Sequence, residues 1–408
     1  MKALVFERNL PRFAASRVLS TMGSGRGAGI GPLRLLDRDP PDLPSSEWLP
    51  LRPLLSGICG SDLATLDGRS SRYFEDLVSF PFVPGHEVVG AATAEGTDRR
   101  GQPVAPGDRV VVEPVLGCAP RHIVPECRWC ASGDSGLCPH VAFGALAPGL
   151  QTGYCADTGG GWSTAGLVAH PSQVHPVPEG FSDEDAVLVE PTACAVHAAL
   201  SAGIEADDLV AVVGAGTLGL ATMAALHQLV RPESPATFLV GAKYEHQRAM
   251  AQSLGADVAV PSDQVARAVR SRSRSLVLGG RLTEGADVVL DCVGSPDSLE
   301  QSLAMVRPRG RVVVVGMPGR VSIDLAPLWH RELTLVGAYA YGTETRAPSV
   351  TRTFELAFDV VAGAGLGRLV TASYPLERFE EAIAHAGAAG RRGATKIAFD
   401  LRTQKGAA

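Results

Sequence analysis

The stretch LVAVVGAGTLGLATMAAL, residues 209–226, constrains the fold more than any other part of the sequence. A short apolar run leads into three glycines in the pattern G-x-G-x-x-G, and an apolar helical pattern follows. Between a strand and a helix, the first glycine permits the tight turn and the second lets a pyrophosphate approach the backbone, while the third lets the helix pack on the sheet. The free amides at the helix start hold the phosphates. The stretch therefore predicts a dinucleotide site at Gly214, Gly216, Thr217, Leu218 and Gly219. The alternative is a glycine-rich turn that binds no ligand.

More apolar runs follow this stretch and alternate with helical segments: TFLVGA, ADVVLDCVG, RVVVVGMPG and LTLVGAY. Continuous apolar strands of this kind are covered on both faces, which indicates a doubly wound parallel sheet. We therefore predict an α/β fold with a Rossmann domain over residues 181–344. Residues 1–180 carry short β-branched runs broken by Gly and Pro, which predicts a mostly β domain. Within it, the Gly/Ser-rich residues 14–32 are expected to form a mobile surface loop.

The second strand of the Rossmann domain indicates which dinucleotide is preferred. A carboxylate is expected at its end to bind the ribose 2′-hydroxyl of NAD. Gly241 and Ala242 occupy the corresponding positions, and Lys243 and Arg248 follow. Nearby cations can pair with a 2′-phosphate, so the sequence favours NADP over NAD. The alternative is that both cations belong to a solvated helix start.

Cysteine usage and charge bound the remaining functions. The chain has 408 residues and eight cysteines, four of which crowd into residues 118–138, including the C-x2-C-x7-C pattern of PECRWCASGDSGLC. This clustering indicates metal binding in a reducing compartment, so the cytoplasm is the expected location. A net charge of −6 gives no general attraction to nucleic acid or to anionic membranes. We see no signal peptide in MKALVFERNLPRF and no apolar run of about 18 residues that would span a membrane.

Three further motifs carry candidate metal ligands. GICGSDLATLDG contains Cys59 and Ser61, PFVPGHEVVG contains His86 and Glu87, and LVEPTACAVH contains Glu190. With the cysteine cluster and G-A-G-x-L-G, these motifs follow one another as in the zinc-dependent medium-chain dehydrogenase/reductase family of alcohol, polyol and threonine dehydrogenases, which this sequence resembles over nearly its whole length. The resemblance implies a GroES-like catalytic domain built from residues 1–180 and 345–408, with a metal lobe at about 115–140. Taken singly, His86 and Cys59 would be ordinary buried residues.

The resemblance also implies a catalytic zinc ion held by Cys59, His86 and one carboxylate. A thiolate, an imidazole and one carboxylate neutralise Zn²⁺ and leave one position open for substrate or water. Members of the polyol branch use the Glu of G-H-E, the Glu of E-P, or both in turn. Glu87 and Glu190 are therefore both candidates, with one ligating and the other standing by.

A second, structural zinc ion is implied for the cysteine lobe. Relatives with this zinc have four cysteines, the first usually three positions before the second, and that position here is Val124. The nearest upstream cysteine gives C-x8-C-x2-C-x7-C, and a longer loop still closes a tetrahedral site at little entropic cost. The predicted quartet is Cys118, Cys127, Cys130 and Cys138. The alternatives are that His122 or His140 substitutes, or that the lobe is empty.

The expected function is hydride transfer between a secondary alcohol or polyol and NADP, with zinc as the Lewis acid. Ser61 resembles the hydroxyl that starts the family's proton relay, whereas Ala64 stands where many members have a relay histidine. Segments resembling those around the ribose and nicotinamide add cofactor-binding candidates at Cys292, Val293, Gly294, Val315 and Gly316. The partners expected are an alcohol or ketone substrate and further copies of the chain in a homodimer or homotetramer. The rival hypotheses are a zinc-independent enoyl or quinone reductase and a non-catalytic cofactor-binding protein.

Overall fold

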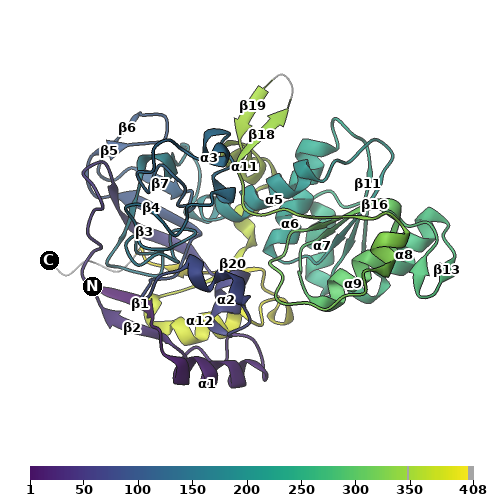
Figure 1. Ribbon diagram of the computed structural model, residues 1–408, viewed down its shortest axis with the longest axis horizontal. Coiled ribbons are helices and arrows are strands. Elements are labelled where there is room, and N and C mark those ends of the chain that lie inside the picture. The colour runs from purple at the N-terminus through teal and green to yellow at the C-terminus, as the bar shows by residue number, and fades with distance from the viewer. Residues whose placement is uncertain (347–348, 403–408) are drawn as a thin grey trace. The chain divides into compact units, whose positions relative to one another are not determined.

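The computed structural model describes residues 1–346 and 349–402, which form two compact units (Figure 1). Unit 1 holds Met1–Glu190 and the chain from Gly365 onward, and unit 2 holds Pro191–Ala364. The sequence-based boundaries at 180 and 344 lie earlier along the chain than these contact-based ones. The first boundary shifts because unit 1 includes α4 (Asp183–Ala186) and the start of α5 (Val189–Ser201). The second shifts because unit 2 includes all of α11 (Thr353–Ala364).

A six-stranded parallel sheet forms the centre of unit 2, in the order β12–β11–β10–β15–β16–β17. This order, in which the first strand lies centrally and the chain runs outward in both directions, is that of the doubly wound Rossmann fold. It confirms the predicted α/β fold. The strands are β10 (Leu209–Val213), β11 (Thr237–Gly241), β12 (Val258–Val260), β15 (Ala286–Asp291), β16 (Val306–Val314) and β17 (Thr334–Gly337).

The first strand of this sheet is buried on both faces. Leu209, Ala211 and Val213 belong to one core cluster, to which α8 and α9 contribute. Val210 and Val212 point to the opposite face because side chains alternate along a strand, and they are fully buried as well. Two covered faces account for the continuous apolar run in the sequence. The other helices and hairpin strands of unit 2 are α6 (Thr217–Ala225), the π-helix η4 (Leu226–Val230), α7 (Glu245–Ser253), α8 (Val265–Ser273), α9 (Pro296–Met305), α10 (Ala326–His330), β13 (Val277–Leu278), β14 (Arg281–Leu282), β18 (Thr343–Arg346) and β19 (Ser349–Arg352).

Unit 1 is built on a seven-stranded sheet in the order β20–β21–β3–β4–β7–β9, with β8 paired to β3. The C-terminal strand β21 runs antiparallel to β3, with Ala398 opposite Gly57, so the end of the chain completes the N-terminal sheet. The strands are β3 (Leu49–Gly57), β4 (Val88–Ala92), β7 (Arg109–Val112), β8 (Leu167–Ala169), β9 (Val174–Pro176), β20 (Val370–Tyr374) and β21 (Lys396–Asp400). The hairpin strands and helices of this unit are β1 (Lys2–Phe6), β2 (Leu33–Asp37), β5 (Gly96–Thr97), β6 (Pro103–Val104), α1 (Leu10–Ser20), α2 (Gly60–Leu66), α3 (Arg128–Ala131), α4 (Asp183–Ala186) and α12 (Phe379–Ala386).

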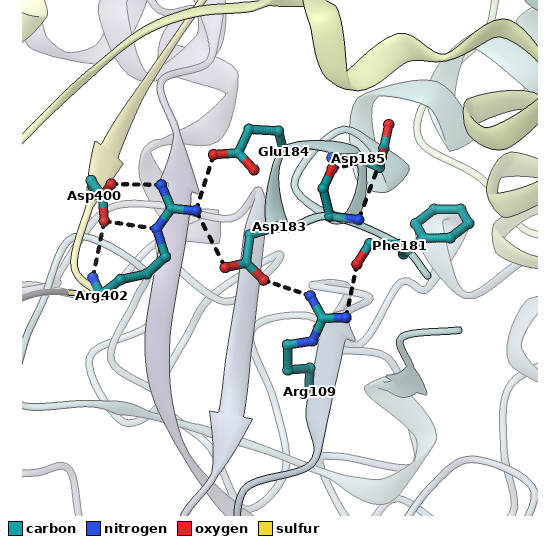
Figure 2. A network of polar contacts seen from close by, with 8 residues as sticks. Arg109, Phe181, Asp183, Glu184, Asp185, Asp400 and Arg402 are labelled. Atoms are coloured by element: carbon teal, nitrogen blue, oxygen red, sulfur yellow. Dashed lines mark hydrogen bonds and ion pairs between the residues drawn. The ribbon is translucent and has the colours of Figure 1, made fainter. Parts of the chain in front are cut away.

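A network of ion pairs joins the end of the chain to α4 and β7 (Figure 2). Arg402 binds Asp400 through two nitrogens, at 3.0 and 2.6 Å, and also pairs with Asp183 and Glu184. Arg109 donates to the other oxygen of Asp183 at 2.8 Å. Three segments distant in sequence are thereby held together.

Residues 14–32, which were expected to form a mobile surface loop, are partly helical. Their first half belongs to helix α1, in which Asn9 caps the first turn by accepting a hydrogen bond from the Arg12 amide at 3.1 Å. Pro11 stands in that first turn, where its missing N–H is not needed. Ser16 is buried and donates to the carbonyl of Leu66 at 2.7 Å. The high glycine content led to the prediction of a loop, whereas a capped helix forms here and packs against the rest of unit 1.

Within residues 1–346 and 349–402, no helix has both the length and the apolar character needed to cross a bilayer.

Candidate metal centre and cofactor turn

Three of the predicted metal ligands meet in unit 1. Cys59 is the N-cap of α2, while His86 and Glu87 directly precede β4. Ligand atoms of all three lie within 4.8 Å of one another. Thiolate, imidazole and carboxylate are the donors that zinc takes in proteins, so the donor set fits a zinc ion. His86 and Glu87 are almost fully buried, which favours charges that are paired or bound to metal.

Asp62 and Tyr154 lie behind the histidine of this trio. His86 Nδ1 lies 3.5 Å from Asp62 Oδ1, and the Tyr154 hydroxyl donates to the same oxygen at 3.2 Å. Burial alone would lower the pKa of His86, but the Asp62 carboxylate and the Cys59 thiol raise it well above its ordinary value. The other Asp62 oxygen accepts a hydrogen bond from the Cys59 amide at 2.9 Å. One carboxylate therefore orients both the thiol-bearing turn and the imidazole.

A buried lysine complements the acid groups of the centre. Lys396, on β21, forms an ion pair with Glu87, and both side chains are almost fully buried. Burial would lower the pKa of Lys396, but the charges of Glu87, Cys59 and Glu190 raise it above its ordinary value. Glu190, at the start of α5, is buried and outside the trio, although it is close enough to interact with the lysine.

Three residues of this centre were missed by the sequence reasoning. Asp62 stands three residues after Cys59, which is the spacing of a helix-capping pair and was a usable signal. Lys396 is the one cation in the strand KIAFD, and a buried cation needs a partner of opposite charge. Tyr154 carried no local signal, because its contact with Asp62 spans 92 positions in sequence.

The cysteine lobe gathers a second donor set. Donor atoms of Cys118, Cys127, Cys138 and His140 lie within 4.8 Å of one another. Cys118 Sγ is 3.7 Å from Cys138 Sγ and 3.4 Å from His140 Nδ1. Cys130 lies beside this set, with its sulfur accepting a hydrogen bond from the Cys118 amide at 3.3 Å. The structure therefore brings together three of the predicted cysteines and His140, which was one of the alternatives. The remaining predicted cysteine, Cys130, lies next to them.

Two thiols of the lobe, those of Cys118 and Cys130, have a raised pKa. Burial raises the pKa of Cys118 to about 11. The hydrogen bond to Cys138, together with burial, raises the pKa of Cys130 as well. Metal ligands must be deprotonated, so binding of zinc here releases protons.

The predicted cofactor segments meet at the carboxyl ends of the unit 2 strands. Gly214 has φ of +92° directly after β10, a left-handed conformation that favours glycine. A Cβ on Gly214 would approach the Val293 side chain to 2.5 Å, and one on Gly294 would approach the Gly316 carbonyl oxygen to 2.4 Å. The turn after β10, residues 292–294 and residues 315–316 therefore lie side by side. Gly216, Thr217, Leu218 and Gly219 form the start of α6 at the same edge.

Cys292 and Arg248 lie near this edge of the sheet, and both are constrained by their surroundings. Burial raises the pKa of Cys292 to about 12, so its thiol is inert at neutral pH. Arg248 donates through one nitrogen to the carbonyls of Ala242 and Lys243, at 3.1 and 3.2 Å. These bonds hold its guanidinium at the carboxyl end of β11, where a ribose substituent of a dinucleotide lies in this fold.

Family models match two parts of the chain. The model described as an alcohol dehydrogenase GroES-like domain matches residues 46–179, and the one described as a zinc-binding dehydrogenase matches residues 237–356. Sorbitol dehydrogenase of Arabidopsis thaliana is 32% identical over 289 residues, covering 70% of this chain and 71% of that protein. L-idonate 5-dehydrogenase of Vitis vinifera is 29% identical over the same shares.

Solved structures share the fold. Galactitol-1-phosphate dehydrogenase from Escherichia coli superimposes with a TM-score of 0.69 at 21% identity, covering 98% of this chain and 100% of that one. A zinc-binding dehydrogenase from Sinorhizobium meliloti, solved bound to NADP, gives a TM-score of 0.64 at 22% identity, with 90% and 95% covered.

Proposed function

This chain belongs to the zinc-dependent medium-chain dehydrogenase/reductase family and is an oxidoreductase of the alcohol and polyol type, and we propose that it interconverts a secondary alcohol or polyol and the ketone with NADP as cofactor. The observation that carries the proposal is the meeting of Cys59 with the buried His86 and Glu87, in a chain that also has the glycine turn at Gly214. The relatives named for sorbitol and L-idonate support a polyol substrate.

In the proposed mechanism, Cys59, His86 and one of the two glutamates hold the zinc ion. When bound, zinc lowers the pKa of the substrate hydroxyl, and the nicotinamide accepts the hydride. Asp62 orients His86 from behind. Ser61, at the start of α2, takes up the hydroxyl proton as the first group of a relay.

Lys396 contributes a positive charge to the centre in this mechanism. The charges of one thiolate and two carboxylates are balanced by the zinc ion together with the ammonium group. Either Glu87 or Glu190 would therefore fit as the third ligand, because the thiolate, the two carboxylates, the ammonium group and the zinc ion would together carry no net charge.

The function is tested by turnover with metal-depleted and zinc-restored enzyme. NADPH absorbance is followed with a panel of polyols and secondary alcohols, and in reverse with ketones. We expect zinc-dependent turnover that Cys59→Ser abolishes. Reduction of enoyl or quinone substrates without zinc would instead support the first rival hypothesis, and cofactor binding without turnover on any substrate would support the non-catalytic one.

The cofactor preference rests on Lys243 and Arg248. We propose that both pair with the 2′-phosphate of NADP, since charge-assisted hydrogen bonds of this kind contribute about 1.5–3 kcal/mol. Lys243→Asp is expected to lower the ratio of kcat/KM for NADP over NAD by about 10- to 100-fold. Arg272→Asp, an exposed arginine on α8, is the matched control. An unchanged ratio in Lys243→Asp would contradict the proposal.

A structural zinc ion in the cysteine lobe is proposed as the second metal. Helix α3 has four residues and the 3₁₀ turn η2 (Ser135–Leu137) has three, too few to be stable alone. Cys118, Cys127 and Cys138 with either Cys130 or His140 would close a tetrahedral site without an open position. Cys138→Ser should remove one zinc per chain and open residues 118–140 to proteolysis.

We also propose a homo-oligomer in the cytoplasm. Strand β17 ends the order of the unit 2 sheet, and its Leu335 and Val336 are 36% and 38% exposed. Trp329, on α10, is 81% exposed. An apolar sheet edge is a template for pairing with a second copy. Val336→Lys should shift the mass measured by light scattering from a dimer or tetramer toward a monomer. All eight cysteines are free thiols, as expected for a reducing compartment.

A further inference from the structure

A third group of metal-ligating side chains lies in unit 1, outside both sites described above. Glu47 precedes β3, His122 lies in the loop between Cys118 and Cys127, and His170 follows β8. Their ligand atoms lie within 4.8 Å of one another. Glu47 Oε1 is 2.9 Å from His122 Nε2 and 3.5 Å from His170 Nε2. Three segments far apart in sequence thus converge on one point.

We propose that Glu47, His122 and His170 form a third metal site, which binds an exchangeable divalent ion of the zinc type. Two imidazoles and one carboxylate are the ligands of open zinc sites, in which water takes the fourth position. At metal–ligand distances of roughly 2.0–2.2 Å, tetrahedral donors stand roughly 3.4 Å apart, so the distances here need only small adjustments. A hollow of about 480 Å³, lined by these three residues with Val124 and Glu126, gives an ion and its water access from solvent.

The loop that carries His122 is held in place by its neighbour. Arg121 is fully buried, and its guanidinium donates to the carbonyls of Leu116, Phe143, Leu146, Ala147 and Gly149. His122 itself has φ of +52°, a left-handed conformation that is uncommon for a residue with a side chain. A rigid loop that sustains such a residue presents its imidazole in one orientation, as a metal ligand requires.

His170 has the outer contacts of a metal ligand. Its Nδ1 lies 2.8 Å from Ser172 Oγ, which can accept a hydrogen bond from Nδ1–H when Nε2 binds a metal. Without metal, Nδ1 accepts from the Ser172 amide at 3.2 Å and Nε2 faces the glutamate. The edge of the Trp48 ring packs against the imidazole, with centroids 5.7 Å apart, and limits its rotation. The contrasting possibility is a His–Glu–His hydrogen-bonded cluster that never takes up an ion.

Metal binding at this site would fix the position of the cysteine lobe relative to the unit 1 sheet. His122 is part of the loop that also carries Cys118, whereas Glu47 and His170 flank strands of the unit 1 sheet. An ion bound here would tie the loop to the sheet, so occupancy of this site would also favour closure of the cysteine site.

Cobalt titration of the metal-depleted full chain distinguishes these possibilities. The two cysteine-containing sites give intense thiolate-to-metal charge-transfer bands, while a site with only nitrogen and oxygen ligands gives weak visible bands alone. We expect the wild-type chain to bind three equivalents, the third without added charge transfer. Dialysis against Zn²⁺ followed by metal analysis should give the same count.

The variants Glu47→Gln and His122→Asn are expected to bind two equivalents and to weaken the third by at least tenfold. Asparagine tolerates the left-handed backbone of His122, and glutamine keeps the shape of Glu47, so both variants should fold. His330→Asn, an exposed histidine on α10, is the matched control and should bind three. Unaltered charge-transfer bands in the variants show that the cysteine sites are intact. A wild-type chain in which every bound equivalent adds charge transfer, or variants that bind as many equivalents as the wild type, would overturn the proposal.

Discussion

At the scale of single residues, the charge balance of the metal centre depends on the buried pair of Lys396 and Glu87. Removing one partner of a buried pair leaves an unpaired charge and costs about 3–5 kcal/mol, whereas replacing both can be nearly neutral. We therefore expect Lys396→Met to lower the free energy of unfolding of the metal-free chain by about that amount. Urea denaturation in the presence of a chelator measures it.

Two further variants control this prediction. Lys396→Arg keeps the charge and should lose less, while the double variant Lys396→Met with Glu87→Gln should recover part of the loss. If the single variant Lys396→Met and the double variant were equally stable, Glu87 would not remain as an uncompensated buried charge in Lys396→Met.

Tyr154 is expected to affect zinc binding without touching the metal. Its hydroxyl donates to Asp62, which in turn lies beside His86. Outer partners of ligands typically alter metal affinity by 10- to 100-fold, and Tyr154 acts one contact further out. Tyr154→Phe should therefore weaken zinc binding by roughly three- to tenfold in a competition titration.

Tyr374→Phe is the matched control for Tyr154. This buried tyrosine also bonds a histidine, with its hydroxyl 2.8 Å from His385 Nδ1, but it lies outside the metal centre. It should lose stability and keep its zinc affinity. A Tyr154→Phe variant with wild-type affinity would show that Asp62 needs no support from the phenol.

At the scale of elements, the N-cap glycine of α6, Gly216, and a glycine inside that helix, Gly219, have different roles. A Cβ on Gly219 would stand 2.0 Å from the Gly214 carbonyl oxygen, while a Cβ on Gly216 would meet nothing within 4 Å. Gly219→Ala is therefore expected to destabilise unit 2 by roughly 1–3 kcal/mol through overpacking. Gly216→Ala should keep wild-type stability and lose dinucleotide affinity, because its methyl group occupies the path of the pyrophosphate. Thermal denaturation and NADPH fluorescence titration separate the two effects. If Gly216→Ala bound NADPH as tightly as the wild type, the assignment of the phosphates to this turn would be wrong.

The ion-pair network at the end of β21 predicts a pH-dependent contribution to stability (Figure 2). Hydrogen bonds from Arg402 lower the pKa of Asp400 from its ordinary 3.8. A depressed pKa means that the folded state favours the ionised form, so the stabilisation is complete above about pH 5 and is lost as the pH falls through the folded pKa. Asp400→Asn should cost about 0.5–1 kcal/mol at pH 7, and the difference from wild type should shrink below pH 4. Denaturant titrations from pH 3 to 7 test this, and a difference independent of pH would assign the effect to packing.

Local patterns predicted the elements whose signals lie within a few residues. The strand β10 and the glycine turn followed from apolar continuity and from the steric needs of the backbone. Helix α1 was missed, because Gly and Ser dominate residues 14–32 while the Asn9 cap lies before them. The candidate metal donors Cys59, His86 and Glu87 were found from short motifs, whereas Lys396 was not, since its partner stands 309 positions away.

At the scale of the whole molecule, the order of strands explains why distant motifs form common sites. Strand β21 pairs with β3, which brings Lys396 to Glu87 across nearly the entire chain. No periodicity in the sequence encodes that pairing, because it depends on which sheet edge the tail reaches. The return of the tail to the first domain was instead predicted from the resemblance to the dehydrogenase family.

Metal and cofactor are expected to protect different units of the chain from hydrogen exchange. The proposed zinc donors all belong to unit 1, and the glycine turn belongs to unit 2. NADP should slow exchange in peptides that contain Gly214–Gly219, since backbone amides there bond the phosphates, while the lobe at 118–140 should not change. A chelator should speed exchange in the lobe and around Cys59, and leave the glycine turn as it was. NAD at the same concentration is the control, and it should protect the turn less because it lacks the 2′-phosphate. Protection by NADP that appears first in the lobe would place the dinucleotide in unit 1 and contradict the assignment of the turn.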